Sequence, residues 1–233
     1  MATDTSESIA LVLGETHAHS MDLKAEGDED GTILEVLWEG IPNRDPSASG
    51  DFVALWQNNG VIPFGTAPQS KQPVTGLTPD GDMAFTELQL ASLPYAVGYS
   101  VGPDATNYYE IAAAVYIQPG GSTESESTRV NVGPVGRTSV IVNYSVPAGI
   151  EPKNFGHRIV LVEGPTYKPT SPPTPLAIAE PGNRSKDAVA FNGVTMVKGE
   201  IYTAAYLMGY DTSKKQVTPT TVAATVTFTV ASS

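Results

Sequence analysis

The feature that most constrains this chain is that its two halves follow one pattern. Residues 34–85 align with residues 140–191 without a gap, at a constant offset of 106 positions. At an offset of 107, residues 95–99 continue the match with residues 202–206. Eight of the 52 pairs in the first block are identical, and all are prolines, glycines or apolar residues: Val36/Val142, Pro46/Pro152, Gly50/Gly156, Leu55/Leu161, Pro63/Pro169, Gly76/Gly182, Ala84/Ala190 and Phe85/Phe191. Such self-similarity predicts two copies of one structural unit.

The length of 233 residues fits two domains of ordinary size. We expect a first domain at 1–118, a linker at 119–127 and a repeat of the first domain at 128–233. The linker prediction rests on a stretch that is small, polar and charged, without an apolar anchor. When residues 6–8 are aligned with 125–127, the first copy has about 13 additional residues between positions 17 and 33, which we interpret as an extra N-terminal hairpin.

Strand signals recur along the whole chain, whereas no window shows the apolar spacing of an amphipathic helix. Apolar and β-branched runs, bounded by turn residues, occur at 32–39, 51–57, 138–146, 158–163 and 221–230. The 22 glycines and 19 prolines suit many turns and oppose long helices. Short strands at this spacing indicate an all-β sandwich or barrel.

The halves also share aromatic positions. Trp38 in the first copy aligns with Tyr144 in the second, and both copies place two tyrosines late in the unit, at positions 95 and 99 and at 202 and 206. In these features and in its cysteine-free tandem units the chain resembles immunoglobulin-like sandwiches, including fibronectin type III domains. The resemblance implies an all-β fold of two tandem immunoglobulin-like antiparallel β-sandwich domains related by internal duplication. No functional residue is carried over from these families.

Charge excludes several classes of partner. With 13 Lys and Arg against 25 Asp and Glu, the formal net charge is −12, so nucleic acid and anionic membrane surfaces are disfavoured. No apolar run has the length of a transmembrane helix, and we expect no transmembrane segment. The start, Met1–Ser8, is polar and acidic, which argues against a signal peptide and leaves the cytoplasm or secretion without a leader as compartments.

A candidate ligand site lies in the loops of the first copy. Trp56 precedes the amides Asn58 and Asn59, and Tyr108 and Tyr109 follow a polar turn. Aromatic rings beside amides suit sugar stacking and partner contacts. On this hypothesis, replacing Trp56 and Tyr108 by Ala abolishes binding and leaves folding largely intact. The alternative is that Trp56 is a core residue and the tyrosines are ordinary strand surface.

Two further groups are candidate metal ligands. His17 and His19 are two positions apart, so on a strand they share a face and could bind zinc or copper. Asp28 and Asp30 in an acidic turn could bind calcium. The alternatives are exposed histidines on an edge strand and a solubilising hairpin turn. Neither group has a third ligand fixed by spacing, and no cofactor is predicted.

No catalytic signature accompanies these residues. The sequence has no cysteine and no Gly-x-Ser-x-Gly motif. We therefore expect a non-enzymatic binding or structural protein that presents loops or an inter-domain groove to a protein or carbohydrate partner, and that could form a homodimer. The alternatives are a secreted effector, toxin or surface-attaching protein, and a metalloenzyme centred on His17 and His19.

Overall fold

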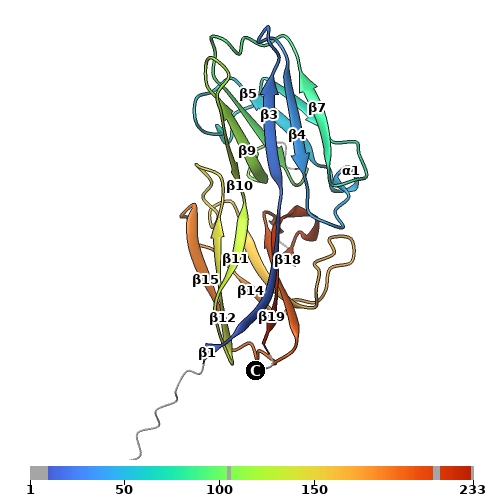
Figure 1. Ribbon diagram of the computed structural model, residues 1–233, viewed down its shortest axis with the longest axis vertical. Coiled ribbons are helices and arrows are strands. Elements are labelled where there is room, and N and C mark those ends of the chain that lie inside the picture. Colours follow the sequence, from blue (N-terminus) through green and yellow to red (C-terminus); the bar gives the residue numbers. More distant parts are fainter. Residues whose placement is uncertain (1–9, 104–105, 212–215, 232–233) are drawn as a thin grey trace, which may run out of the picture.

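The computed structural model describes residues 10–103, 106–211 and 216–231, and these form an all-β structure of several antiparallel sheets. The all-β sandwich fold predicted from the strand pattern is thereby confirmed. Two sandwiches are stacked along the long axis of the molecule (Figure 1). We call them the upper and the lower sandwich, as they stand in that view.

The upper sandwich packs a three-stranded sheet against a five-stranded one. In spatial order, the first sheet contains β3 (Asp22–Gly27), β4 (Leu34–Glu39) and β7 (Gly81–Phe85). The second contains β10 (Thr123–Ser127), β9 (Ile111–Ile117), β8 (Tyr95–Ser100), β5 (Phe52–Trp56) and β6 (Ser70–Pro73). A single helical turn, α1 (Pro46–Ser49), precedes β5.

The lower sandwich has a closely similar strand order. Its four-stranded sheet contains β1 (Ala10–Leu11), β11 (Arg129–Gly136), β12 (Ser139–Ser145) and β15 (Lys186–Asn192). Its five-stranded sheet contains β14 (Ala177–Ala179), β13 (Arg158–Glu163), β16 (Ile201–Leu207), β19 (Val222–Val230) and β2 (Leu13–Ser20). A small ribbon of β17 (Tyr210–Asp211) and β18 (Gln216–Val217), then a 3₁₀ turn (Pro219–Thr221), lead into β19.

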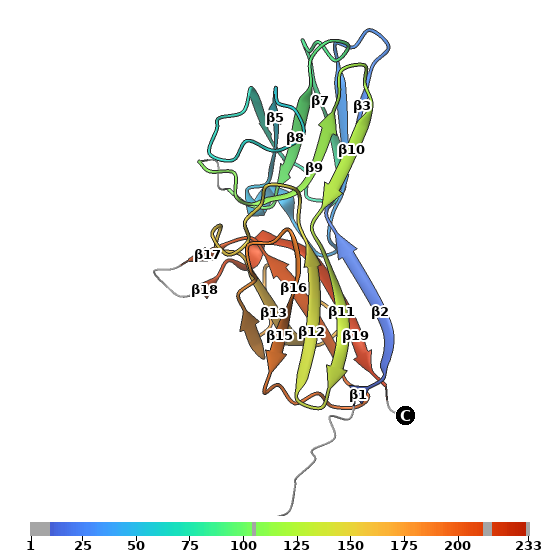
Figure 2. The ribbon, with the colours of Figure 1, turned by 90° about the vertical axis from the view of Figure 1, so that its left-hand side faces the viewer.

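The two sandwiches exchange their leading strands. β2 pairs with the last strand of the lower sandwich, β19, and the chain then passes through Met21 into β3 of the upper sandwich. In the opposite direction, β10 pairs with β9 in the upper sandwich, and the chain passes through Thr128 into β11 of the lower one. Figure 2 shows β2 beside β19, and β10 and β11 in succession along the same side. Both crossing residues are fully buried.

This exchange corrects two predictions made from the sequence, the extra hairpin at residues 17–33 and the linker at residues 119–127. The expected extra hairpin is two strands that lie in different sandwiches, and the expected linker contains β10, which is paired along its whole length with β9. The side chains of β10 are exposed or half-buried. An edge strand of this kind is held by backbone hydrogen bonds, so its sequence needs no apolar anchor and resembles that of a linker.

The matched glycines have one structural role in both halves. Gly50 and Gly156 both have a φ of 77°, in the left-handed region that a residue with a side chain rarely adopts. Each ends a turn that the next residue closes by donating its backbone N–H to the carbonyl of the matched proline. These bonds run from Asp51 to Pro46, at 3.0 Å, and from His157 to Pro152, at 2.8 Å.

The central strands of the five-stranded sheets, such as β5 and β13, are buried on both faces, which explains their continuous apolar runs. In the upper sandwich the loop 57–69 folds over the outer face, where Ile62 packs with Phe52 and Trp56 of β5. In the lower sandwich Tyr167 covers the outer face in the same way, against Val160. Strand β4, in contrast, alternates buried and exposed residues because the outer face of its sheet is open to solvent.

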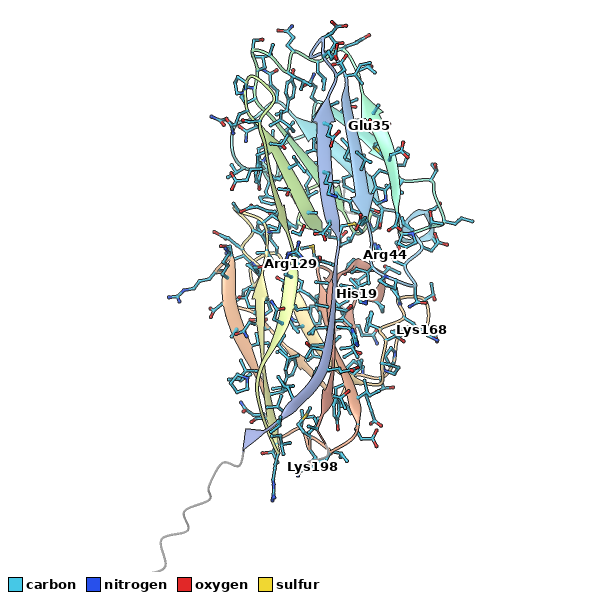
Figure 3. The ribbon with its side chains drawn as sticks, viewed as in Figure 1. His19, Glu35, Arg44, Arg129, Lys168 and Lys198 are labelled. Atoms are coloured by element: carbon cyan, nitrogen blue, oxygen red, sulfur yellow. The ribbon has the colours of Figure 1, made fainter. Side chains whose placement is uncertain are left out.

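Buried polar groups join the sandwiches at their junction. Asp51 accepts hydrogen bonds from the guanidinium of Arg44 and from the hydroxyl of Tyr99, the latter at 3.0 Å. The same guanidinium donates to the backbone carbonyls of Thr220 and Val222 in the lower sandwich. Both members of the ion pair have fully buried side chains, and Figure 3 shows Arg44 at the level where the sandwiches meet. Burial raises the pKa of Asp51, and Arg44 opposes that effect.

The lower sandwich contributes His157 to the same junction. Its Nε2 lies 2.9 Å from the carbonyl oxygen of Tyr109, which can only accept, so Nε2 carries the proton. Its Nδ1 therefore accepts from the hydroxyl of Tyr206, at 3.0 Å. Burial lowers the pKa of His157 to about 4 because the charged imidazolium would lose its hydration. The junction therefore holds a neutral histidine near pH 7.

Candidate functional site

The aromatic residues expected at the surface are largely packed inside. Trp56 is 2% exposed and Tyr108 is 6% exposed. Their rings meet edge to face with centroids 5.3 Å apart, and Trp56 Nε1 donates to the carbonyl of Thr66 at 2.9 Å. These contacts correspond to the alternative in which Trp56 is a core residue. Replacing either residue by Ala should therefore destabilise the upper sandwich.

Tyr109 faces the lower sandwich. Its ring stacks on Phe155, with centroids 3.9 Å apart and planes 10° from parallel, and Phe64 packs against Phe155 at 5.1 Å. The carbonyl of Tyr109 is also the partner of His157. The loops at this end of the upper sandwich are therefore engaged by the lower sandwich.

A groove beside the loop 57–69 brings two of the expected residues together. It has a volume of about 380 Å³, and the residues that line it are Trp56, Gln57, Asn58, Pro63, Thr66, Ala67, Pro68 and Gln69. Asn58 Nδ2 donates to the carbonyl of Val61 at 2.7 Å, which holds the turn that forms one side. Asn59, Tyr108 and Tyr109 do not line this groove.

The side chains that line the groove carry no formal charge. Every lining residue is uncharged, in a chain whose formal net charge is −12. The amides of Gln57 and Gln69 are exposed and offer both donors and acceptors. The proline rings supply apolar surface between them. Sequence reasoning did not select Gln57 or Gln69 as site residues, although they flank a proline-rich loop next to a tryptophan, which is a signal that could have marked them.

His17 and His19 lie on β2, where their register partners on β19 are Thr227 and Thr225. The side chain of His17 is 68% exposed, and its Nε2 is 3.8 Å from a carboxylate oxygen of Glu15. Within residues 10–103, 106–211 and 216–231, no group of three or more His, Cys, Asp or Glu side chains is placed to hold a metal ion. The described part of the chain thus gives the two histidines no third ligand.

Asp28 stabilises the turn between β3 and β4. Its carboxylate accepts from the backbone N–H of Thr32 at 2.8 Å and of Ile33 at 2.9 Å, and from the Thr32 hydroxyl at 3.2 Å. These hydrogen bonds lower the pKa of Asp28, and the bond from the backbone N–H of Ile33 has the largest effect. Asp30 is exposed on the same turn. Both line a hollow of about 290 Å³ together with Gly120 and Gly121.

Comparison with known proteins adds little to this geometry. No protein-family model matches the sequence, and no curated protein matches it. A solved chain described as "Biofilm associated protein - BSP domain" aligns with 81% of this chain, at 12% sequence identity and a TM-score of 0.24. The alignment spans 26% of that chain, about a quarter of its length. In the described residues, no helix is both long and apolar enough to cross a membrane.

Proposed function

We propose that this chain is a non-enzymatic binding protein whose upper sandwich contacts a neutral carbohydrate at the groove beside loop 57–69. The observation that carries the proposal is the uncharged lining of that groove in a strongly acidic chain. Sugars offer hydroxyl groups to amides and C–H faces to apolar rings, and the groove supplies both kinds of surface.

The volume of the groove supports a small saccharide. About 380 Å³ is within the range of small-molecule sites in proteins, which start near 300 Å³. Because Trp56 is held by Thr66 and Tyr108, the wall that it forms is fixed before a ligand arrives. A preformed site reduces the ordering that binding would otherwise require.

The same proposal includes the origin of the scaffold: two immunoglobulin-like units related by internal duplication. Supporting it, β4, β5, β6 and β7 lie at the positions of β12, β13, β14 and β15 when residue numbers are shifted by 106. The equivalent strands also occupy equivalent places in their sheets. In this proposal the lower sandwich supports the upper one through the buried junction.

Glycan-array screening of the intact chain, followed by calorimetry with the best neutral oligosaccharide, tests the proposal. The variant Gln57→Ala/Gln69→Ala removes two amides that are exposed, so it should fold normally and lose about tenfold or more in affinity. The matched control is Gln89→Ala, an exposed glutamine outside the groove. Absence of binding to every neutral glycan, or equal affinity of the double variant and the control, would contradict the proposal.

A further inference from the structure

The strand exchange between the sandwiches is reciprocal. We define the first half of the chain as residues 10–117 and the second half as residues 123–231. The first half gives its leading strand, β2, to the last strand of the second half, β19. The second half gives its leading strand, β10, to the last strand of the first half, β9. Each half therefore supplies the edge strand of the other half's five-stranded sheet.

The backbone contacts at the crossing are equivalent in the two halves. Met21, which follows β2, donates its N–H to the carbonyl of Ala223 in β19, at 3.2 Å. Thr128, which follows β10, donates its N–H to the carbonyl of Ala112 in β9, at 2.8 Å. The two connections therefore make the same hydrogen bond to the same place in the opposite half.

The side chains at the crossing contact their own equivalents. Arg129, labelled in Figure 3, donates to Asp22 at 2.8 Å and to the hydroxyl of Ser20 at 3.0 Å. Ser127, which is equivalent to Ser20, donates to Asp22 at 2.8 Å. Contacts between equivalent positions are typical of residues beside the two-fold axis of a homodimer. The chain thus has the arrangement of a strand-exchanged homodimer whose two subunits are joined.

The crossing is too short for a leading strand to close the sheet of its own half. β10 runs toward the junction of the sandwiches and β3 runs away from it (Figures 1 and 2), so β2 in the place of β10 would have to reverse direction before β3. Only Met21 lies between β2 and β3, and only Thr128 lies between β10 and β11. Strand reversals commonly need at least two loop residues. Each half therefore needs a second half as its partner.

The two halves are joined in the chain by the loop 118–122. Gln118 donates its backbone N–H to the carbonyl of Ser122, and Gly121 donates to that of Gln118, both at 2.9 Å. Gly120 and Gly121 have φ values of 89° and 88°, in the region that favours glycine. Residues 119–122 are exposed. If this loop opens, each half can make all of its contacts with the opposite half of another chain.

We infer that the intact chain exchanges halves with a second copy of itself. In this dimer the first half of each chain pairs with the second half of the other, and the opened loop 118–122 connects the two pairs. The contacts between the halves are the same in monomer and dimer, so the loop sets the balance between the two forms. A short flexible linker gives an effective concentration of the order of millimolar. The monomer is therefore favoured in dilute protein, and the dimer increases toward that concentration.

Refolding at two concentrations is the first test. The full chain is unfolded in urea, refolded at about 1 µM and at about 1 mM, and analysed by size exclusion with light scattering. The ratio of dimer to monomer should rise by about a thousandfold, because it is proportional to the concentration of monomer. Monomer alone at both concentrations would overturn the inference.

A disulfide identifies the chain that supplies β2. Because the sequence has no cysteine, His17→Cys/Thr227→Cys introduces a single pair, at register partners on β2 and β19. In the monomer this disulfide lies within one chain, whereas in the exchanged dimer it links two chains on a denaturing gel. The matched control is Asn131→Cys/Asn143→Cys, register partners on β11 and β12, whose disulfide stays within one chain in both forms. A dimer in which neither disulfide links two chains would assign the contact to another surface and overturn the inference.

The length of the loop should control the balance between monomer and dimer. Deleting residues 119–121 joins Gln118 to Ser122 in a connection that lacks the Gly, Asn or Asp of a tight hairpin turn. We expect this variant to be a dimer already at about 1 µM, whereas inserting Gly-Ser-Gly-Ser after Gly121 should keep the chain monomeric there. A folded deletion variant that remains monomeric would also overturn the inference.

Discussion

The upper and lower sandwiches share a strand arrangement but are assembled from the chain in different ways. The upper sandwich is contiguous in sequence, from β3 to β10, and its exchanged strand β10 directly follows its partner β9. The lower sandwich combines β1 and β2 with strands that begin at β11, so its exchanged strand is about 200 residues from its partner β19. The two sandwiches are therefore similar in architecture, but the lower one needs strands from the start of the chain and the upper one does not.

The two halves also place different polar residues at one equivalent buried position, and these residues have different hydrogen-bond partners. Asp51 and His157 occupy equivalent positions, and each is hydrogen-bonded to the equivalent tyrosine, Tyr99 or Tyr206, at 3.0 Å. The carboxylate needs a cation and receives Arg44, whereas the neutral imidazole needs only a carbonyl and receives that of Tyr109. The position equivalent to Arg44 in the second copy is Ile150. The junction is therefore built from two non-identical contacts.

The largest expected effect comes from separating the halves at their structural boundaries. A fragment of residues 21–127 should fold on its own, because it contains every strand of the upper sandwich. Residues 128–233 alone should fail to fold, because the edge of β19 and the apolar surface beside it lose β1 and β2. Circular dichroism and urea titration check this, and a peptide of residues 10–20 should restore the second fragment. A stable 128–233 fragment without the peptide would show that the exchange is dispensable.

The next effect concerns the ion pair at the junction. Replacing Asp51 by Ala leaves the Arg44 guanidinium buried without its counter-ion, and we expect a loss of about 3–5 kcal/mol in the free energy of unfolding. The double variant Arg44→Met/Asp51→Ala should recover part of that loss because no charge remains buried. Urea unfolding of the intact chain measures both. A double variant that is as unstable as Asp51→Ala would exclude an unpaired charge as the cause.

His157 gives the lower half a pH dependence opposite in direction to that of Asp51, because burial lowers the pKa of His157 and raises that of Asp51. The pKa is 6.5 for the exposed side chain and about 4 when folded, so the unfolded chain gains a proton first as the pH falls. The contribution of His157 to the free energy of unfolding is complete above pH 6.5. It decreases by about 3 kcal/mol in total as the pH falls to 4.

The measurement is the difference in unfolding free energy between the parent and His157→Gln from pH 7 to pH 4. Subtracting the variant removes the contribution of the many carboxylates, which titrate in both proteins. We expect the difference to fall steadily below pH 6.5. A difference that stays constant across this range would mean that His157 is protonated in the folded protein or does not titrate separately.

The smallest expected effect lies at the crossing of the exchanged strands. Asp22 and Arg129 are equivalent positions in the two copies and pair at 2.8 Å, with side chains 40% and 55% exposed. Reversing the pair, in Asp22→Arg/Arg129→Asp, should change stability by less than about 1 kcal/mol, whereas Arg129→Asp alone places two acids together. Thermal unfolding at low and high salt distinguishes these variants, and a large loss in the reversed pair would indicate contacts beyond charge.

Sequence reasoning identified β4, β5, β12, β13 and β19 because their apolar runs are local signals. The matched residues 34–85 and 140–191 correspond strand by strand, and matched glycines such as Gly50 and Gly156 mark the same turn. The exchange could not be seen in this way. β2 and β10 are polar edge strands in which most side chains contact water, so nothing in their side-chain pattern names the strand that receives their backbone hydrogen bonds.

The positions of the candidate site residues also have physical causes that the sequence does not display. Trp56 and Tyr108 were predicted to bind a ligand because each adjoins polar turn residues. Their burial under a covering loop could not be foreseen, because such a loop leaves no periodic signal of its own. Asn58 does line a groove. Trp38 was matched with Tyr144, and both are buried. The indole of Trp38 packs so closely on Gly81 that a side chain there would collide with it, a relation between two strands that a single sequence does not display.

The pairing of β2 with β19 has a consequence for how the protein is made. At a synthesis rate of about 5–20 residues per second, β2 leaves the ribosome roughly 10–40 seconds before its partner does. Throughout that interval it must remain in water as an unpaired strand beside growing apolar sheets. Its polar residues Glu15, Thr16, His17 and His19 keep the unpaired strand soluble during that interval, whereas an apolar strand would aggregate with neighbouring nascent chains.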